Sequence, residues 1–233
     1  DDLAGAGCEG VKYVGALPLR PKEHQAEQWR GMATNDLQVV ATDHCPICWS
    51  QKQIGLTDFR QIPNGVPGVE HRVELIYEGA VAQKRLSLNR WVEICSVTPA
   101  RMFGMYGRKG VLAPGADADI VVYDPAGHTS IGLGKTHHMN MDYSPWEGFE
   151  IDGHVDTVLS RGQVVVDDGA FLGRAGHGRF IRRQLSQSLT CGARWHRRRP
   201  DASMSSQSRL RQPWRTSILA TPPMAIGSAH HRV

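Results

Sequence analysis

The chain has 233 residues, a formal net charge of +4 and an apolar content of 40%, which is ordinary for a folded protein. Its length allows one domain and part of a second, because a complete (β/α)8 barrel alone takes about 250 residues. No apolar run is long enough to cross a bilayer, so we expect no membrane partner. The odd number of cysteines, five, favours reduced thiols and a cytoplasmic location.

The basic charge is concentrated at the end of the chain. Residues 188–233 hold eight arginines and one acidic residue, a net charge of +7, which leaves −3 on residues 1–187. A mildly acidic globular part argues against a specific nucleic-acid partner, because a basic tail binds polyanions without specificity. Residues 184–233 are rich in arginine, serine and proline without periodicity, and this composition predicts a disordered tail.

The first part of the chain predicts alternating strands and helices. Residues 11–14 suit a short strand, residues 23–32 a helix, and residues 37–41 a second strand after a turn. The second strand has consecutive apolar residues, which is typical of a strand covered on both faces. Strand, helix and strand in this order build a parallel sheet.

The second strand stops at Asp43, next to His44, and Pro46 prevents it from continuing. Barrel enzymes place catalytic groups at the carboxyl ends of such strands, so Asp43 is the candidate catalytic residue. The alternative is a surface aspartate that caps a turn. Cys45 and Cys48 form a CxxC pair, but without a second pair or a thioredoxin-like context we favour neither zinc binding nor redox chemistry.

A loop rich in glycine, proline and asparagine follows and extends to Gly68. Loops at the carboxyl ends of barrel strands carry substrate contacts. The length of this loop therefore indicates that it belongs to the substrate site. A helical face is then predicted from the spacing of Val69, Val73, Ile76 and Ala80.

Two further helices are predicted before residue 105. Ser87 is placed to cap the first of these helices. The residues that this helix is expected to bury are Leu88, Trp91 and Cys95. Thr98 followed by Pro99 is typical of the start of another helix, which Gly104 ends.

From residue 109 the pattern changes to short strands with tight turns. Strands are predicted at residues 118–123, 157–159 and 163–166, with a turn at 167–169. We interpret Asp117 and Asp119 as turn residues. His137, His138, Asn140 and Asp142 lie in a loop without helical spacing, so we expect a surface loop there in preference to a metal site. Residues 143–146 are expected to pack the two parts together.

Motifs spread over residues 11–183 occur together in a recognisable order. They are Tyr13–Pro21, Thr42–Pro46, Gln51-Lys52, Ile62–Glu70, Arg72, Pro99-Ala100, Phe103-Gly104, Arg108–Gly110, Gly115–Ile120, Asp142-Tyr143, Glu147-Gly148 and Gly176–Ile181. In this order the chain resembles the C-terminal part of the dihydropyrimidinase/D-hydantoinase family of cyclic amidohydrolases.

The resemblance implies an α/β fold: the C-terminal portion of a metal-dependent (β/α)8 barrel at residues 1–108 and part of a small β-sandwich subdomain with the C-terminal segment at 109–183. The predicted tail at 184–233 lies outside the resemblance. It implies a hydrolase that opens the cyclic amide C–N bond of dihydropyrimidines or hydantoins with a metal-activated hydroxide. It also implies two divalent metal ions, usually zinc, and a homotetramer in the complete protein.

The resemblance also assigns site residues. Asp43 matches the aspartate that is both a metal ligand and the general base. Asn64 matches a position that binds the ring amide. Ala16 stands where the family usually has a serine whose main chain contacts the ring, so the contact through the backbone need not be lost.

The family's other metal ligands, a His-x-His pair, a carboxylated lysine and two further histidines, are not found in this chain. We therefore expect an incomplete chain that binds no metal by itself and is inactive when isolated. The alternative function is a non-catalytic scaffold or assembly protein of the same fold. An upstream His-x-His would favour the enzyme over the scaffold.

Overall fold

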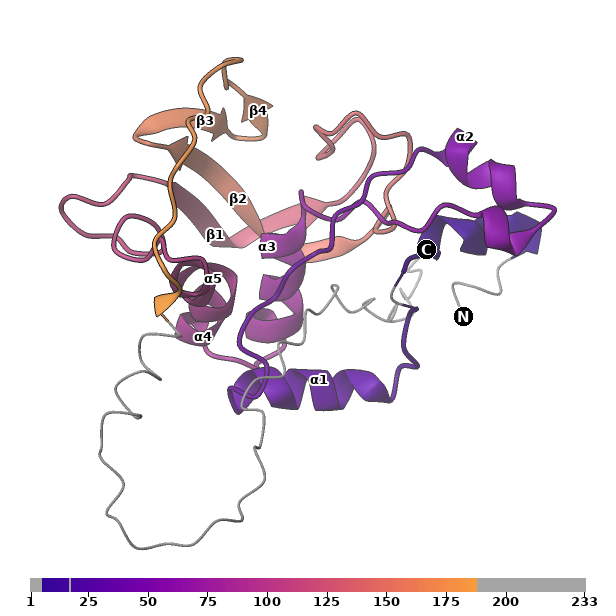
Figure 1. Ribbon diagram of the computed structural model, residues 1–233, viewed down its shortest axis with the longest axis horizontal. Coiled ribbons are helices and arrows are strands. Elements are labelled where there is room, and N and C mark those ends of the chain that lie inside the picture. The colour runs from indigo at the N-terminus through magenta and orange to yellow at the C-terminus, as the bar shows by residue number, and fades with distance from the viewer. Residues whose placement is uncertain (1–5, 17, 188–233) are drawn as a thin grey trace, which may run out of the picture.

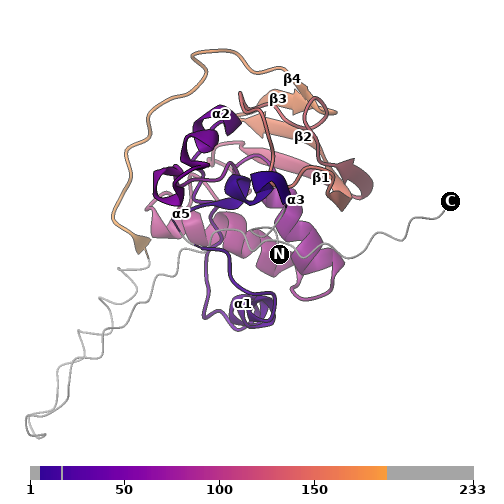
Figure 2. The same ribbon diagram turned by 90° about the vertical axis from the view of Figure 1, so that its right-hand side faces the viewer.

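The computed structural model describes residues 6–16 and 18–187. Helices occupy the first half of the chain and one antiparallel sheet the second (Figure 1). In both views helix α3 (Arg72–Tyr77) lies between the sheet and helix α1 (His24–Ala33) (Figures 1 and 2). No helix of the described residues is long and apolar enough to cross a membrane.

Helix α1 spans His24–Ala33, close to the predicted residues 23–32, and this prediction is confirmed. It buries Trp29 and Met32 on one face. Thr34 is the C-cap of this helix, and Asn35 adopts a left-handed φ of 68°, as asparagine tolerates in turns.

The two strands predicted before Asp43 are not formed. Residues Ala6–Tyr13 form a 3₁₀ helix, so the strand predicted at 11–14 is wrong. Residues 38–43 form no strand, so the strand predicted at 37–41 is also wrong. Val40 is buried, yet its N–H donates to the carbonyl of Ile94 (3.3 Å) and its carbonyl accepts from Arg72 (3.3 Å). The backbone N–H and carbonyl groups of Val40, which a parallel sheet would use for pairing, therefore bond to residues of helical segments.

Helix α3, Arg72–Tyr77, continues into a π-helical turn at Glu78–Ala82. It contains most of the predicted helical face, but Val69 precedes it and is 51% exposed. The expectation that Val69 belongs to this face is wrong, because the chain turns into the helix only after that residue.

Helix α4 (Leu88–Val92), a π-helical turn (Glu93–Val97) and helix α5 (Thr98–Met102) follow one another without a break. The Ser87 hydroxyl accepts from the N–H of Arg90 (3.1 Å), so the predicted cap is confirmed. Thr98 lies inside this continuous helix and is not an N-cap. Leu88 is 55% exposed, contrary to expectation, whereas Trp91 is buried.

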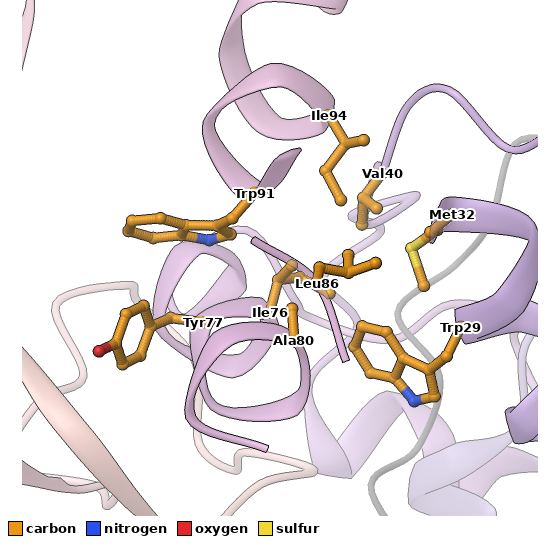
Figure 3. Packing of buried hydrophobic residues seen from close by; sticks show 9 residues of the cluster. All are labelled: Trp29, Met32, Val40, Ile76, Tyr77, Ala80, Leu86, Trp91 and Ile94. Atoms are coloured by element: carbon orange, nitrogen blue, oxygen red, sulfur yellow. The ribbon is translucent and has the colours of Figure 1, made fainter. Parts of the chain in front are cut away.

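The main core lies between α1, α3 and α4 (Figure 3). Its buried members are Trp29, Met32, Val40, Ile76, Tyr77, Ala80, Leu86, Trp91 and Ile94. The rings of Tyr77 and Trp91 meet edge to face with centroids 5.2 Å apart, and Tyr123 of the sheet packs against both. The aromatic residues thus join the helices to the sheet.

The sheet contains β1 (Ile120–Ser130), β2 (Glu150–Ser160), β3 (Gln163–Asp167) and β4 (Ala170–Phe171), in the order β1-β2-β3-β4 with antiparallel pairs. The predicted β region is confirmed, but β1 extends beyond the expected end at Tyr123. It does so through a register shift between Asp124 and His128, which accommodates Pro125.

A second cluster of Leu75, Ile131, Trp146 and Ile151 packs α3 against β2. The N–H of Gln184 donates to the carbonyl of Gly104 (3.0 Å), so the start of the predicted tail contacts the region that follows helix α5. The rest of that tail, residues 188–233, lies outside the described residues. The barrel, the sandwich and the boundaries after residues 108 and 183 stay predictions.

Candidate functional site

Three segments far apart in the sequence meet at the candidate site. The N–H of Gly65 donates to the carbonyl of Val14 (3.1 Å), and the N–H of Cys45 donates to the carbonyl of Val66 (3.3 Å). His44 and Val66 also form an isolated parallel bridge. The segments that carry Ala16, Asp43 and Asn64 are therefore held together by backbone hydrogen bonds.

Asp43 stands at the end of the extended segment that begins near Val40. It is exposed and has a φ of 48°, in the left-handed region. This conformation costs on the order of 1 kcal/mol for a residue with a side chain, and aspartate tolerates it better than most. Non-glycine residues in this conformation occur at functional sites and also in turns, as at Asn35 and Asp168. The carboxylate is thus displayed to solvent by a backbone that turns sharply.

His44, next to Asp43, has a structural role. Its Nδ1 accepts from the N–H groups of Gly68 (3.1 Å) and Val69 (3.3 Å). Because both partners are donors, Nδ1 carries no proton in this arrangement. His44 therefore fixes the end of the long loop against the Asp43 segment.

Asn64 and Ala16 are both exposed. Next to Asn64, Gly65 lies so close to the neighbouring segment that a Cβ there would be 2.6 Å from the carbonyl oxygen of Cys45. The Cys45 thiol contacts the carbonyl oxygen of Asn64 (3.7 Å). A glycine is needed at position 65 for the loop to approach this closely.

Lys52, the last residue of the short helix α2 (Trp49–Lys52), was not singled out as a site residue. Its exposed fraction is 0%, and its Nζ donates to the carbonyls of Val14 (2.6 Å) and Pro63 (2.8 Å). Burial lowers the pKa of Lys52. The signal available in the sequence was the Gln51-Lys52 motif, but a lone lysine is usually a surface residue.

Helix α2 is fixed by the loop around residue 142. The N–H of Trp49 donates to both carboxylate oxygens of Asp142 (2.8 and 3.1 Å), and the Trp49 and Tyr143 rings meet edge to face. Tyr143 is 4% exposed and Trp146 8% exposed. The expectation that residues 143–146 pack the two parts together is confirmed.

The loop with His137 and His138 is not a simple surface loop. His137 keeps only 3% of its side chain exposed, so the expectation of a surface position is wrong for this residue. Nδ1 of His138 lies 2.8 Å from Oε1 of Glu70, and its Nε2 lies 2.9 Å from the carbonyl oxygen of Gly169. These contacts join the loop to the segment before α3 and to the β3–β4 turn.

The sequence profile of the amidohydrolase family matches residues 22–165 of this chain. The chain therefore belongs to the amidohydrolase family. Within that family it is 57% identical over 191 residues to the D-hydantoinase of Streptomyces coelicolor, covering 82% of this chain and 40% of that protein. The resemblance to the dihydropyrimidinase/D-hydantoinase family is confirmed.

Solved structures of a D-hydantoinase and a dihydropyrimidinase also match this chain. The D-hydantoinase from Bacillus sp. AR9 matches with a TM-score of 0.76 and 46% identity, over 78% of this chain and 40% of that one. The dihydropyrimidinase from Brevibacillus agri NCHU1002 matches with a TM-score of 0.76 and 44% identity, over 79% of this chain and 40% of that one. The chain thus spans about two fifths of the length of these relatives.

Amidohydrolases are generally metal-dependent. In the part of the chain that the structure describes, no group of three His, Cys, Asp or Glu side chains is arranged to hold a metal ion. A catalytic zinc site takes about three protein ligands. The described residues therefore do not fit a complete metal centre, and Asp43 could contribute only one ligand to it.

Proposed function

We propose that the protein to which this chain belongs is a hydrolase that opens the cyclic amide C–N bond of dihydropyrimidines or hydantoins. The observation that carries the proposal is the meeting of the segments of Ala16, Asp43 and Asn64, joined by the Val14–Gly65 and Cys45–Val66 hydrogen bonds. The 57% identity to a D-hydantoinase supports it. Because the chain covers 40% of that relative, the activity is proposed for the complete protein.

In this proposal Asp43 moves the proton. Its carboxylate accepts a proton from the attacking water oxygen as the new C–O bond forms at the ring carbonyl carbon. It then returns the proton to the ring nitrogen as the C–N bond breaks, so that the opened product carries a carboxylic acid group and the former ring nitrogen has gained one N–H bond. General acid–base catalysis of this kind contributes typically ~10²–10⁴-fold. The exposed, left-handed Asp43 suits a group that must reach a bound substrate.

Asn64 and the backbone at Ala16 orient the ring in the same proposal. Amides donate and accept hydrogen bonds, so an asparagine side chain or a backbone peptide group can satisfy both sides of a ring amide. The contact at Ala16 needs no side chain, which is why alanine can stand there. Fixing the ring in this way holds its carbonyl carbon near the proton acceptor.

The complete enzyme is proposed to hold two divalent metal ions, with zinc as the leading candidate, and Asp43 as one of their ligands. The ligand set would need residues from outside the described part of the chain, because no three candidate ligands gather within it. The proposed assembly of the complete protein is a homotetramer.

The test is Asp43→Asn in the complete enzyme, assayed on dihydrouracil and on a 5-substituted hydantoin. This change keeps the size of the side chain and removes its charge and basicity, so kcat should fall at least about 10²-fold. Asp36→Asn is the matched control, because it makes the same change at an exposed turn. A folded Asp43→Asn enzyme within tenfold of the wild type would refute the role of Asp43. No turnover by the wild type would refute the function.

A further inference from the structure

Lys52 is a buried cation without a carboxylate within hydrogen-bonding distance among the described residues. Its exposed fraction is 0%, and its Nζ donates to two backbone carbonyls. Burying a charged group is costly unless its hydrogen bonds are satisfied. A lysine kept in such a place, where an apolar residue of similar volume would avoid the desolvation, needs a reason beyond the filling of space.

The two carbonyls identify that reason. Val14 lies two residues before Ala16, and Pro63 lies immediately before Asn64. Nζ of Lys52 is 2.6 Å from the carbonyl oxygen of Val14 and 2.8 Å from that of Pro63. One nitrogen atom therefore connects the two segments that are proposed to contact the substrate ring.

We propose that Lys52 is a positioning residue that sets the spacing between the Ala16 and Asn64 segments. The inference rests on the proposed function for its substrate, but the connection itself is a property of the fold. Lys52 is fully buried and its Nζ is hydrogen-bonded to backbone carbonyls, so in this proposal it does not touch the substrate. It acts through the backbone groups that it holds.

The anchoring of α2 makes the spacing fixed. The Asp142 carboxylate accepts from the N–H of Trp49 at the start of α2, and the Lys12 ammonium lies 5.2 Å from the centroid of the Trp49 ring. A helix held at its first residue presents Lys52, at its last residue, in a defined direction. Because the backbone of Lys52 is fixed, the two hydrogen bonds of its Nζ can set the distance between the two loops.

The same geometry argues against a role in which Lys52 titrates during the reaction. Both of its partners are carbonyls, which only accept hydrogen bonds. An ammonium group and a neutral amine each have at least two N–H bonds to donate, so both can hold the two carbonyls. The pH profile of the enzyme should therefore not depend on Lys52.

The test compares Lys52→Met with Lys52→Gln in the complete enzyme. Methionine keeps the approximate volume and removes the donors, whereas the glutamine amide keeps two N–H donors on a shorter side chain. Lys22→Met is the matched control, because it removes the same charge from an exposed position. For Lys52→Met we expect KM for dihydrouracil to rise at least tenfold, with a smaller change in kcat and unmoved limbs of the pH profile. Lys52→Gln should lie between this variant and the wild type.

Hydrogen exchange gives a second measurement that needs no activity. The N–H of Gly65 is bonded to the carbonyl of Val14, which also accepts from Lys52. Amide exchange in a peptide covering residues 62–68 should accelerate at least tenfold in Lys52→Met, while α3 stays protected. If Lys52→Met does not fold, the same local acceleration in Lys52→Gln supports the proposal.

Three results would overturn the positioning role: unchanged exchange at residues 62–68, a uniform rise in exchange that includes α3, or an unchanged KM in an active enzyme whose loops have loosened. A wild-type enzyme that opens neither dihydrouracil nor a hydantoin would instead refute the proposed function. In that case local exchange still decides whether Lys52 fixes the two segments.

Discussion

The sheet and the loops around Asp43 are stabilised in different ways. In the sheet, each strand pairs with its neighbour in sequence, and β2 and β3 are separated only by the turn at Arg161-Gly162. Around Asp43, the contacts join residues that lie 11 to 93 positions apart, as in the Lys52–Pro63 and Trp49–Asp142 bonds. The β2–β3 and β3–β4 pairs are local in sequence, whereas the segments of the site come together only through contacts between distant parts of the chain.

The largest expected effect concerns the isolated 233-residue chain. We expect it to show no measurable opening of dihydrouracil or hydantoins and to hold fewer than two zinc ions per chain, because no complete ligand group exists among its described residues. Metal analysis and a ring-opening assay on the purified chain test this. Two tightly bound zinc ions, or clear turnover, would show that the site does not depend on further protein.

The next prediction compares two residues of helix α4 and tests where the core ends. Trp91→Ala should lower the free energy of unfolding by about 3–5 kcal/mol, because it removes a buried aromatic residue. Leu88→Ala, on the exposed side of the same helix, should change it by less than about 0.5 kcal/mol. Urea unfolding monitored by circular dichroism measures both. Equal losses would contradict the assigned burial of this helix.

A third prediction tests the close approach of the loops at the site. In Gly65→Ala the new Cβ would lie 2.6 Å from the carbonyl oxygen of Cys45. We expect a loss of about 1–3 kcal/mol in stability, as for other overpacked positions, and faster exchange at residues 62–68. Gly115→Ala is the control, because its new methyl group would meet open space. Gly115 has a φ of +88°, so this substitution adds backbone strain without a clash. A Gly65→Ala protein as stable as the control would show that these loops are loosely packed.

The smallest expected effect is a pH dependence at His138. Its hydrogen bond to the carbonyl of Gly169, together with the carboxylate of Glu70, raises the pKa of His138 above its usual value, and His71 and His137 also face this cluster. Because the folded-state pKa is raised, the stabilisation is complete below about pH 6.5 and is lost as the pH rises through the raised pKa.

Melting temperatures of the wild type and His138→Gln, measured from pH 5 to 9, test this dependence. The difference between the two proteins should be largest at low pH and shrink as the pH rises. His24→Gln, at an exposed histidine, is the control. A difference that grows with pH would mean that His138 is stabilised in its neutral form.

Local patterns predicted the elements whose bonds are local. The helix at residues 24–33, the cap at Ser87 and the hairpin strands β2 and β3 all follow from neighbouring residues. The strand expected at residues 37–41 failed for the opposite reason. The N–H of Val40 donates to the carbonyl of Ile94 and its carbonyl accepts from Arg72, and no short window of sequence contains those partners.

The same limit applies to the candidate site. The motif around Asp43 was sufficient to single out that residue, and the resemblance added Ala16 and Asn64. Periodicity could not reveal that Lys52 is buried, because lysine is rarely found in a protein interior. It could not reveal the burial of His137 either, since the residues that cover it come from distant segments.

The interruption of β1 has a consequence for self-association. Within the described residues β1 is an outer strand of the sheet, paired only with β2. Pro125 supplies no N–H group, and register shifts between Val122 and Tyr123 and between Asp124 and His128 divide the pairing into three short stretches. An incoming strand from another molecule would therefore find only a few residues in line at a time, too short a template for the growth of a continuous intermolecular ladder.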